Sequence, residues 1–135
     1  MYLLHLDKNH EYLISKLDEI GFKNDIDLIS SKIEIEKKIH KYSGLILRSR
    51  IPIDDTFIKK AKNLKFIARV GSGLENIDVK SAKTNNIEVI SAGEANANAV
   101  GEHIFGLLFS LINKINISSI QVKKRYMEKR TKQRN

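Results

Sequence analysis

The stretch of sequence that decides the fold is Phe66-Ile-Ala-Arg-Val-Gly71-Ser-Gly73-Leu-Glu-Asn-Ile-Asp78. Its first residues are mostly apolar and partly β-branched, which predicts a buried strand over residues 66–70. Gly71 and Gly73 are expected to take positive φ angles and to let a ligand approach the backbone. Successive N–H groups in such a turn suit an anion, and open α/β sheets bind ligands at the carboxyl ends of their strands. These residues are equally compatible with a plain turn into the helix that Asp78 begins.

The same turn falls short of a dinucleotide-binding fingerprint. That fingerprint needs a third glycine, and Asn76 stands in its place. The predicted helix also starts too late, because pyrophosphate binding needs a helix N-terminus that points directly at the phosphates. We therefore do not expect a pyrophosphate site at this turn.

The rest of the chain alternates short apolar runs with segments of helical periodicity. Five such alternations predict the α/β class, with a doubly wound, flavodoxin-like parallel sheet of about five strands followed by a long C-terminal helix. The predicted strands cover residues 2–6, 26–29, 44–47, 66–70 and 87–90, and the first four helices cover residues 10–20, 31–40, 55–61 and 78–84.

The long C-terminal helix is predicted from about Asn98 to Asn116, and apolar residues cover more than one of its faces. A helix that is apolar nearly all round must be buried on several sides, and one small sheet covers only one of them. We predict an exposed patch that leads to a homodimer or aggregate. The alternative is a helix at the centre of an ordinary core. The patch would contain Phe105, Leu108, Phe109 and Ile112.

The composition is that of a cytoplasmic globular protein, with 41% hydrophobic and 30% charged residues over a length of 135. The sequence has no cysteine, which excludes disulfides and thiolate metal sites, and no histidine spacing predicts a metal site. Charged residues interrupt the first apolar run, so no signal peptide is expected. No apolar run is long enough to span a bilayer, so no membrane partner is expected.

The net charge of +8 is concentrated at the C-terminus. Residues 121–135 hold seven basic residues and one acidic residue, so residues 1–120 carry only +2. A basic tail could bind nucleic acid, but the lack of interleaved aromatic residues favours a solvated linker. We expect at most weak binding to duplex DNA that vanishes near physiological salt.

Cationic side chains follow the predicted strand 44–47. Arg48, Ser49 and Arg50 come directly after it, and the turn 71–73 follows the next strand along the chain. Both loops should meet at one edge of a parallel sheet, where guanidinium groups bind carboxylate or phosphate and the turn supplies backbone donors. This predicts a pocket for a small anionic metabolite, although the two arginines could also be plain surface charges.

Three segments resemble the D-isomer-specific 2-hydroxyacid dehydrogenases. They are Gly44-Leu-Ile-Leu-Arg48-Ser49, the stretch from Phe66 to Asp78, and Asn96-Ala-Asn-Ala-Val-Gly-Glu-His103. Within that family the chain most resembles the D-3-phosphoglycerate dehydrogenases. The resemblance covers nearly the whole chain and implies an NAD-dependent oxidoreductase that acts on the CH–OH group of a small 2-hydroxy acid, or on the matching 2-oxo acid.

The resemblance also implies roles for individual residues. Arg48, with Ser49 beside it, would bind the anionic end of the substrate. Gly71 and Ser72 would hold the substrate carboxylate through backbone N–H groups, and Ser72 would also border the NAD cofactor. Asn96 would line the active-site cleft. The helix around residues 98–116 would form the homodimer.

The resemblance divides the chain into a substrate-binding domain (1–92), a crossover helix towards a nucleotide-binding domain (93–120) and a basic tail (121–135). The sequence ends before the family's nucleotide fingerprint, and the family's catalytic Arg, Glu and His all lie beyond that fingerprint. We therefore expect no catalytic residue in this chain, and no NAD reduction by residues 1–135 alone. Gly93 also stands where the family usually has proline. The alternative function is a stand-alone module that binds small anions.

Overall fold

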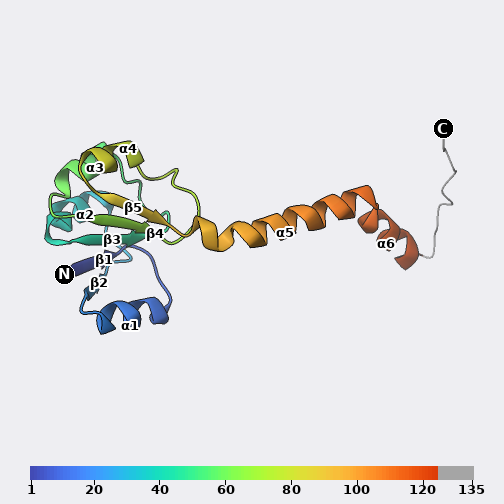
Figure 1. Ribbon diagram of the computed structural model, residues 1–135, viewed down its shortest axis with the longest axis horizontal. Coiled ribbons are helices and arrows are strands. Elements are labelled where there is room, and N and C mark those ends of the chain that lie inside the picture. The colour runs from blue at the N-terminus through green and yellow to red at the C-terminus, as the bar shows by residue number, and fades with distance from the viewer. Residues whose placement is uncertain (125–135) are drawn as a thin grey trace. The chain divides into compact units, whose positions relative to one another are not determined.

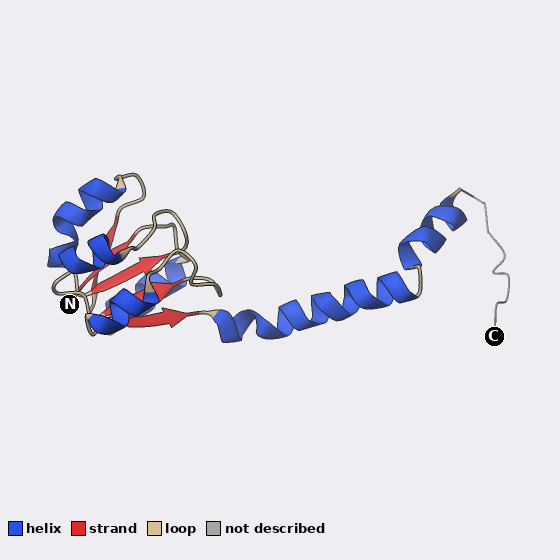
Figure 2. Ribbon diagram, turned by 90° about the horizontal axis from the view of Figure 1, so that it is seen from above, coloured by secondary structure: helices blue, strands red, loops and turns tan. Residues whose placement is uncertain are grey.

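A computed structural model describes residues 1–124 of the protein (Figure 1). The chain divides into two compact units, Met1–Glu94 and Ala95–Asn135, and each is described by itself. The first unit holds a parallel sheet in the order β2-β1-β3-β4-β5, seen as red arrows in Figure 2. This is the flavodoxin-like order that the sequence predicted. The strands are β1 (Tyr2–His5), β2 (Lys23–Ile26), β3 (Gly44–Leu47), β4 (Phe66–Arg69) and β5 (Glu88–Ser91).

The direction of winding reverses at β1, and this reversal divides the helices between two faces of the sheet. Right-handed crossovers place the helix between β1 and β2 on one face and the next three on the other, as Figure 1 shows. The first face carries α1 (Glu11–Glu19), and the second carries α2 (Lys32–Lys38), α3 (Asp55–Lys60) and α4 (Val79–Thr84), with a short 3₁₀ turn, η1 (Ile39–Lys41), before β3.

The main hydrophobic core lies between the sheet and the three helices of the second face. Strands β1, β3 and β4 bury alternate side chains against it, as parallel strands do when helices cover them. From the helices, Phe57 of α3 is the largest side chain with no exposed surface. The core also contains Leu4, Leu6, Ile35, Ile39, Leu45, Leu47, Ile58 and Ile67.

Side-chain caps fix the helix starts where the sequence predicted them. Ser31 forms a capping box with Glu34 at the start of α2. Asp54 accepts a hydrogen bond from the backbone N–H of Phe57 at 3.0 Å, at the start of α3. Each cap satisfies a backbone donor that has no partner within its helix, so these polar residues set the boundaries.

The prediction of the second strand over residues 26–29 is wrong, because the strand covers Lys23–Ile26. It is an edge strand that pairs only with β1, and most of its side chains are exposed, so its sequence need not be apolar. The apolar run that suggested the strand lies in the following loop, where Leu28 and Ile29 are exposed. Asp27 holds this loop, since its carboxylate accepts hydrogen bonds from the backbone N–H groups of Ile29 and Ser30.

The long helix also differs from its prediction. α5 runs from Gly93 to Ile112 rather than from 98 to 116, and α6 (Ile115–Lys123) follows it. Lys114 has a φ of 52°, a left-handed conformation that ends one helix before the next begins. The apolar side chains of α5 are exposed as predicted, with Phe105 at 60%.

Within residues 1–124, no single helix is both long and apolar enough to cross a membrane. Helices α5 and α6 meet that criterion only when they are taken together, and they are bent by 59° relative to each other. Most of the predicted basic tail, residues 125–135, lies outside the described residues.

Candidate functional site

The ends of four strands meet at the carboxyl edge of the sheet. The backbone N–H of Arg48, after β3, donates to the Asp7 carboxylate after β1 at 2.7 Å. The backbone N–H of Val70 donates to Leu47 O at 2.8 Å, which joins the ends of β4 and β3. The N–H of Ala92, after β5, donates to Gly71 O at 3.0 Å. The Arg48 loop and the glycine turn therefore lie at one edge, as the sequence predicted.

A second connection joins the loops further from the sheet. Ile53 and Ile77 form an isolated parallel bridge. The backbone N–H of Ile53 donates to Asn76 O at 2.8 Å, and the N–H of Asp78 donates to Ile53 O at the same distance. Because both loops are held at two places, the segments 48–53 and 71–78 form one rigid rim.

The two glycines of the turn do not have the positive φ angles that the sequence predicted. Among the glycines of residues 1–124, only Gly21 has a positive φ. At Gly71, a side chain would overlap the guanidinium of Arg69, whose Cζ lies 2.9 Å from the position of an added Cβ. At Gly73, the added Cβ would lie 2.6 Å from the carboxyl carbon of Glu75. The glycines make room for these two charged side chains to lie against the turn.

The turn offers backbone donors from only part of its length. The N–H of Gly71 donates to Arg69 O at 2.9 Å, so this donor is already used. Within residues 1–124, the backbone N–H groups of Ser72 and Gly73 make no hydrogen bond. Ser72 is exposed, and its backbone oxygen lies 3.7 Å from a Cβ added at Gly93, where α5 begins. Two adjacent N–H groups and one exposed hydroxyl are therefore available to an anion.

Arg48 and Arg50 have opposite roles although they lie two residues apart. Arg50 donates from Nε to Leu6 O, from Nη1 to Ser30 O and from Nη2 to Asp27 O, at 2.6, 2.6 and 2.9 Å. Its guanidinium therefore holds the loop after β2 in place. Arg48 is exposed, and its side chain makes no hydrogen bond or ion pair with residues 1–124. Ser49 is exposed beside it.

Asp27 also stabilises the loop after β2 that Arg50 holds in place. Burial raises the pKa of the Asp27 carboxyl, but the ion pair with Lys38 and the hydrogen bonds from Ser30 and Ile29 outweigh it and hold that pKa well below its usual range. The carboxylate is thus charged and fully engaged, so this loop contributes rigidity rather than a binding group.

Arg69 is a candidate site residue that the sequence reasoning used only as part of a motif. Its guanidinium lies against Gly71, and its Nε is buried without a hydrogen-bond partner among residues 1–124. The charge of this guanidinium next to two open backbone N–H groups strengthens the anion-binding character of the rim. The signal in the sequence was the spacing Arg-x-Gly, because the missing side chain of Gly71 leaves room for the Arg69 guanidinium.

Two of the predicted roles are not tested by the described geometry. Asn96 belongs to the second unit and is exposed in the first turns of α5, so its place in the cleft stays a prediction. The role of Ser72 beside a cofactor also stays a prediction. The first turn of α4 does not suit pyrophosphate, because the Asp78 carboxylate already accepts from the N–H of Ser81 at 2.9 Å. Residues 1–124 contain no cluster of side chains suited to a metal ion.

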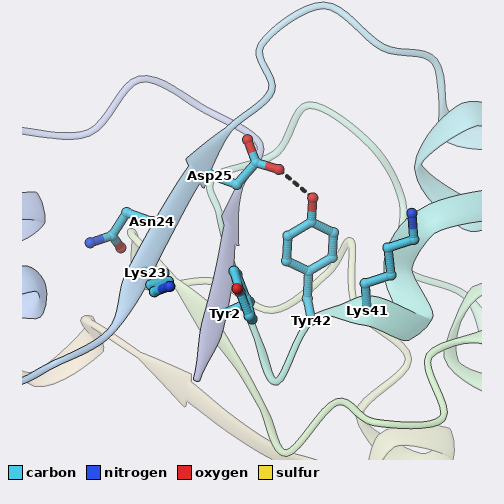
Figure 3. A pocket seen from close by; sticks show the side chains of 6 residues that line it. All are labelled: Tyr2, Lys23, Asn24, Asp25, Lys41 and Tyr42. Atoms are coloured by element: carbon cyan, nitrogen blue, oxygen red, sulfur yellow. Dashed lines mark hydrogen bonds between the residues drawn. The ribbon is translucent and has the colours of Figure 1, made fainter.

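A hollow of about 420 Å³ lies at the amino edge, the opposite end of the strands (Figure 3). Most of its polar groups already have partners. The Tyr42 hydroxyl donates to Asp25, and burial together with this bond raises the pKa of Tyr42. The Lys23 ammonium lies 5.5 Å from the centre of the Tyr2 ring. None of the predicted site residues lines this hollow, so the carboxyl edge remains the candidate site. The lining residues are Tyr2, Lys23, Asn24, Asp25, Lys41 and Tyr42.

The sequence profile of the D-isomer specific 2-hydroxyacid dehydrogenase catalytic domain matches residues 3–133. The chain belongs to this family. The match extends over nearly the whole sequence and confirms the resemblance that rested on three short segments.

Curated members of the dehydrogenase family align with most of the chain. D-3-phosphoglycerate dehydrogenase of Archaeoglobus fulgidus is 29% identical over 130 residues, which are 96% of this chain and 25% of that protein. Hydroxypyruvate reductase of Thermotoga maritima is 33% identical over 125 residues, which are 93% of this chain and 40% of that protein. The chain thus spans between a quarter and two fifths of the length of these two relatives.

Solved structures share the fold. A protein from Pyrococcus horikoshii superimposes with a TM-score of 0.86 at 24% identity, covering 95% of this chain and 38% of that one. A 3-phosphoglycerate dehydrogenase from Entamoeba histolytica, solved with NAD⁺ bound, gives a TM-score of 0.63 at 26% identity, covering 82% of this chain and 38% of that one. The flavodoxin-like sheet is therefore the family's fold.

Proposed function

We propose that residues 1–92 bind the carboxylate of a small 2-hydroxy or 2-oxo acid for an NAD-dependent oxidoreductase of the 2-hydroxyacid dehydrogenase family. The observation that carries this proposal is the rim at the carboxyl edge of the sheet. There the two open N–H groups of Ser72 and Gly73 lie in the turn that the Arg48 loop joins, and Arg69 lies against the same turn. Backbone donors and guanidinium groups together suit a ligand that has a carboxylate at one end and a second anionic or polar group at the other.

The role of each group follows from its chemistry. The turn would bind the carboxylate next to the reacting carbon, because two adjacent N–H groups can each donate a hydrogen bond to one carboxylate oxygen. Arg48 would bind the far end of the acid, since its guanidinium is exposed and has no hydrogen-bond or ion-pair partner within residues 1–124. This part of the chain would position the substrate, and Ser72 would border the NAD cofactor. A stand-alone module that binds small anions would use the same rim.

The finer substrate assignment is a 3-phosphoglycerate-like acid. It is supported by the relative from Archaeoglobus fulgidus and by the cation at Arg48, which suits a phosphate. The relative from Thermotoga maritima supports hydroxypyruvate as the second candidate, because its name gives that substrate.

Replacing Arg48 by alanine is expected to weaken the binding of 3-phosphoglycerate about 10- to 100-fold, which corresponds to the loss of one charge-assisted hydrogen-bonded pair. The measurement is a titration of the ¹⁵N-labelled chain followed by NMR, in which the amide signals of Ser72 and Gly73 should shift. The matched control is Lys65→Ala, which removes an exposed cation at the opposite edge of the sheet and should leave the affinity unchanged. Equal affinities for wild type and Arg48→Ala would remove Arg48 from the site.

We also propose that α5 forms a homodimer. The helix carries large apolar side chains that stay exposed in the described chain, and surfaces of this kind associate in water. Sedimentation should give a dimer at micromolar concentrations, and Phe109→Asp should shift it to a monomer. A wild-type chain that stays monomeric over that range would contradict the proposal. Phe105, Leu108, Phe109 and Ile112 are 60%, 43%, 56% and 61% exposed.

A further inference from the structure

The glycine turn at the candidate site is flanked by two side chains of opposite charge. Arg69 lies against Gly71, and the carboxylate of Glu75 lies against Gly73. The Glu75 carboxylate is thus in contact with the backbone that would receive the substrate carboxylate. It makes no hydrogen bond and no ion pair with any residue in the range 1–124.

No cation of residues 1–124 forms an ion pair with this carboxylate. The Arg50 guanidinium donates to three backbone carbonyls and is therefore not available to pair with Glu75. The Asp7 carboxylate accepts from the backbone N–H of Arg48, so it leaves the Arg48 side chain free for a ligand. The rim therefore presents the cations Arg48 and Arg69 to a ligand, together with a carboxylate at Gly73. Glu75 is exposed and neither caps a backbone donor nor pairs with a cation in the described chain, so its charge is open to a ligand at the turn.

We propose that Glu75 is a specificity-determining residue that limits how much negative charge the glycine turn accepts. This inference rests on the proposed function and deepens it. The electrostatic repulsion between Glu75 and a bound acid increases in proportion to the negative charge of the acid. At a separation of about 6 Å in a water-like dielectric, each additional charge changes the affinity about threefold. Glu75 therefore weakens the binding of phosphorylated acids more than that of acids with a single negative charge, and so reduces the advantage that a phosphate gains from Arg48.

The test compares two acids that share a carboxylate and a 2-hydroxyl group. D-Glycerate carries one negative charge, and 3-phosphoglycerate carries about three near pH 8. Both are titrated into the ¹⁵N-labelled full chain at low ionic strength, with the Ser72 and Gly73 amide signals as the readout. Glu75→Gln should tighten D-glycerate binding about threefold and 3-phosphoglycerate binding about 10- to 27-fold, the upper value applying if all three charges lie at that separation. The preference for the phosphorylated acid should rise at least threefold.

Two further variants make the result specific. Glu75→Ala should behave like Glu75→Gln if the charge is responsible, and it covers the case in which one variant folds poorly. Glu88→Gln removes an exposed carboxylate at the amino edge of β5 and should leave both affinities unchanged.

The outcomes separate the inference from the proposed function. Binding in the wild type with an unchanged ratio of affinities in both Glu75 variants overturns the inference and leaves the anion site standing. Binding that appears only in the Glu75 variants supports the inference. Shifts in neither the wild type nor the variants overturn the anion site, and the inference with it.

Discussion

Replacement of Arg50 by alanine is expected to lower the free energy of unfolding by about 3–4 kcal/mol. The Arg50 guanidinium donates to the backbone oxygens of Leu6, Asp27 and Ser30, and these three groups belong to two separate segments of the chain. The alanine variant would leave the three carbonyls without that donor, in a partly buried region. Urea denaturation followed by circular dichroism gives the free energy directly.

Arg48→Ala is the matched control, because it removes the same side chain two residues earlier. That guanidinium is exposed and has no partner among residues 1–124, so the change in stability should stay within about 0.5 kcal/mol. Arg50→Lys should fall between the two, since an ammonium cannot reach three divergent carbonyls with the geometry of a guanidinium. A loss below about 1 kcal/mol for Arg50→Ala would show that water replaces the guanidinium at little cost.

These two arginines also show where reasoning from the sequence stops. Both follow the same strand, and both are suitable for an anion site. Their roles separate only when the loop after β2 folds against the end of β3, a contact between residues about 20 positions apart. Local sequence carries no signal for such a contact, so Arg50 could not be assigned to the scaffold beforehand.

The overall fold was more predictable because its signals are local. The apolar runs of β1, β3 and β4 are buried central strands, and the capping residues Ser31, Asp54 and Asp78 mark the helix starts. β2 was misplaced because an edge strand needs no apolar run, while the apolar residues after it are exposed. Hydrophobic periodicity therefore predicts the strands and helices that pack into the core, and it fails for the edge strand of the sheet.

The position of the candidate site could be predicted from the sequence, but the conformation of its glycine turn could not. The glycine turn lies at the carboxyl edge next to the Arg48 loop, as parallel topology requires. The sequence suggested a left-handed backbone at both glycines, but neither has one, and the ends of the Arg69 and Glu75 side chains lie where a Cβ would stand. A glycine in the sequence is compatible with either arrangement, so the residue type alone cannot tell them apart.

Replacement of Phe57 by alanine is expected to lower the free energy of unfolding by about 3–5 kcal/mol. Phe57 has no exposed surface and anchors α3 over the sheet, directly after the segment that carries Arg48 and bridges to Ile77. The variant loses buried apolar area and leaves a cavity that close-packed neighbours fill only in part. Ile33→Ala, at a 67% exposed position of α2, should cost less than about 0.5 kcal/mol in the same urea titration. The NMR signals of Ser72 and Gly73 should also broaden in Phe57→Ala, because the rim depends on the packing of α3. A Phe57 variant as stable as Ile33→Ala would show that α3 is not part of the core that supports the site.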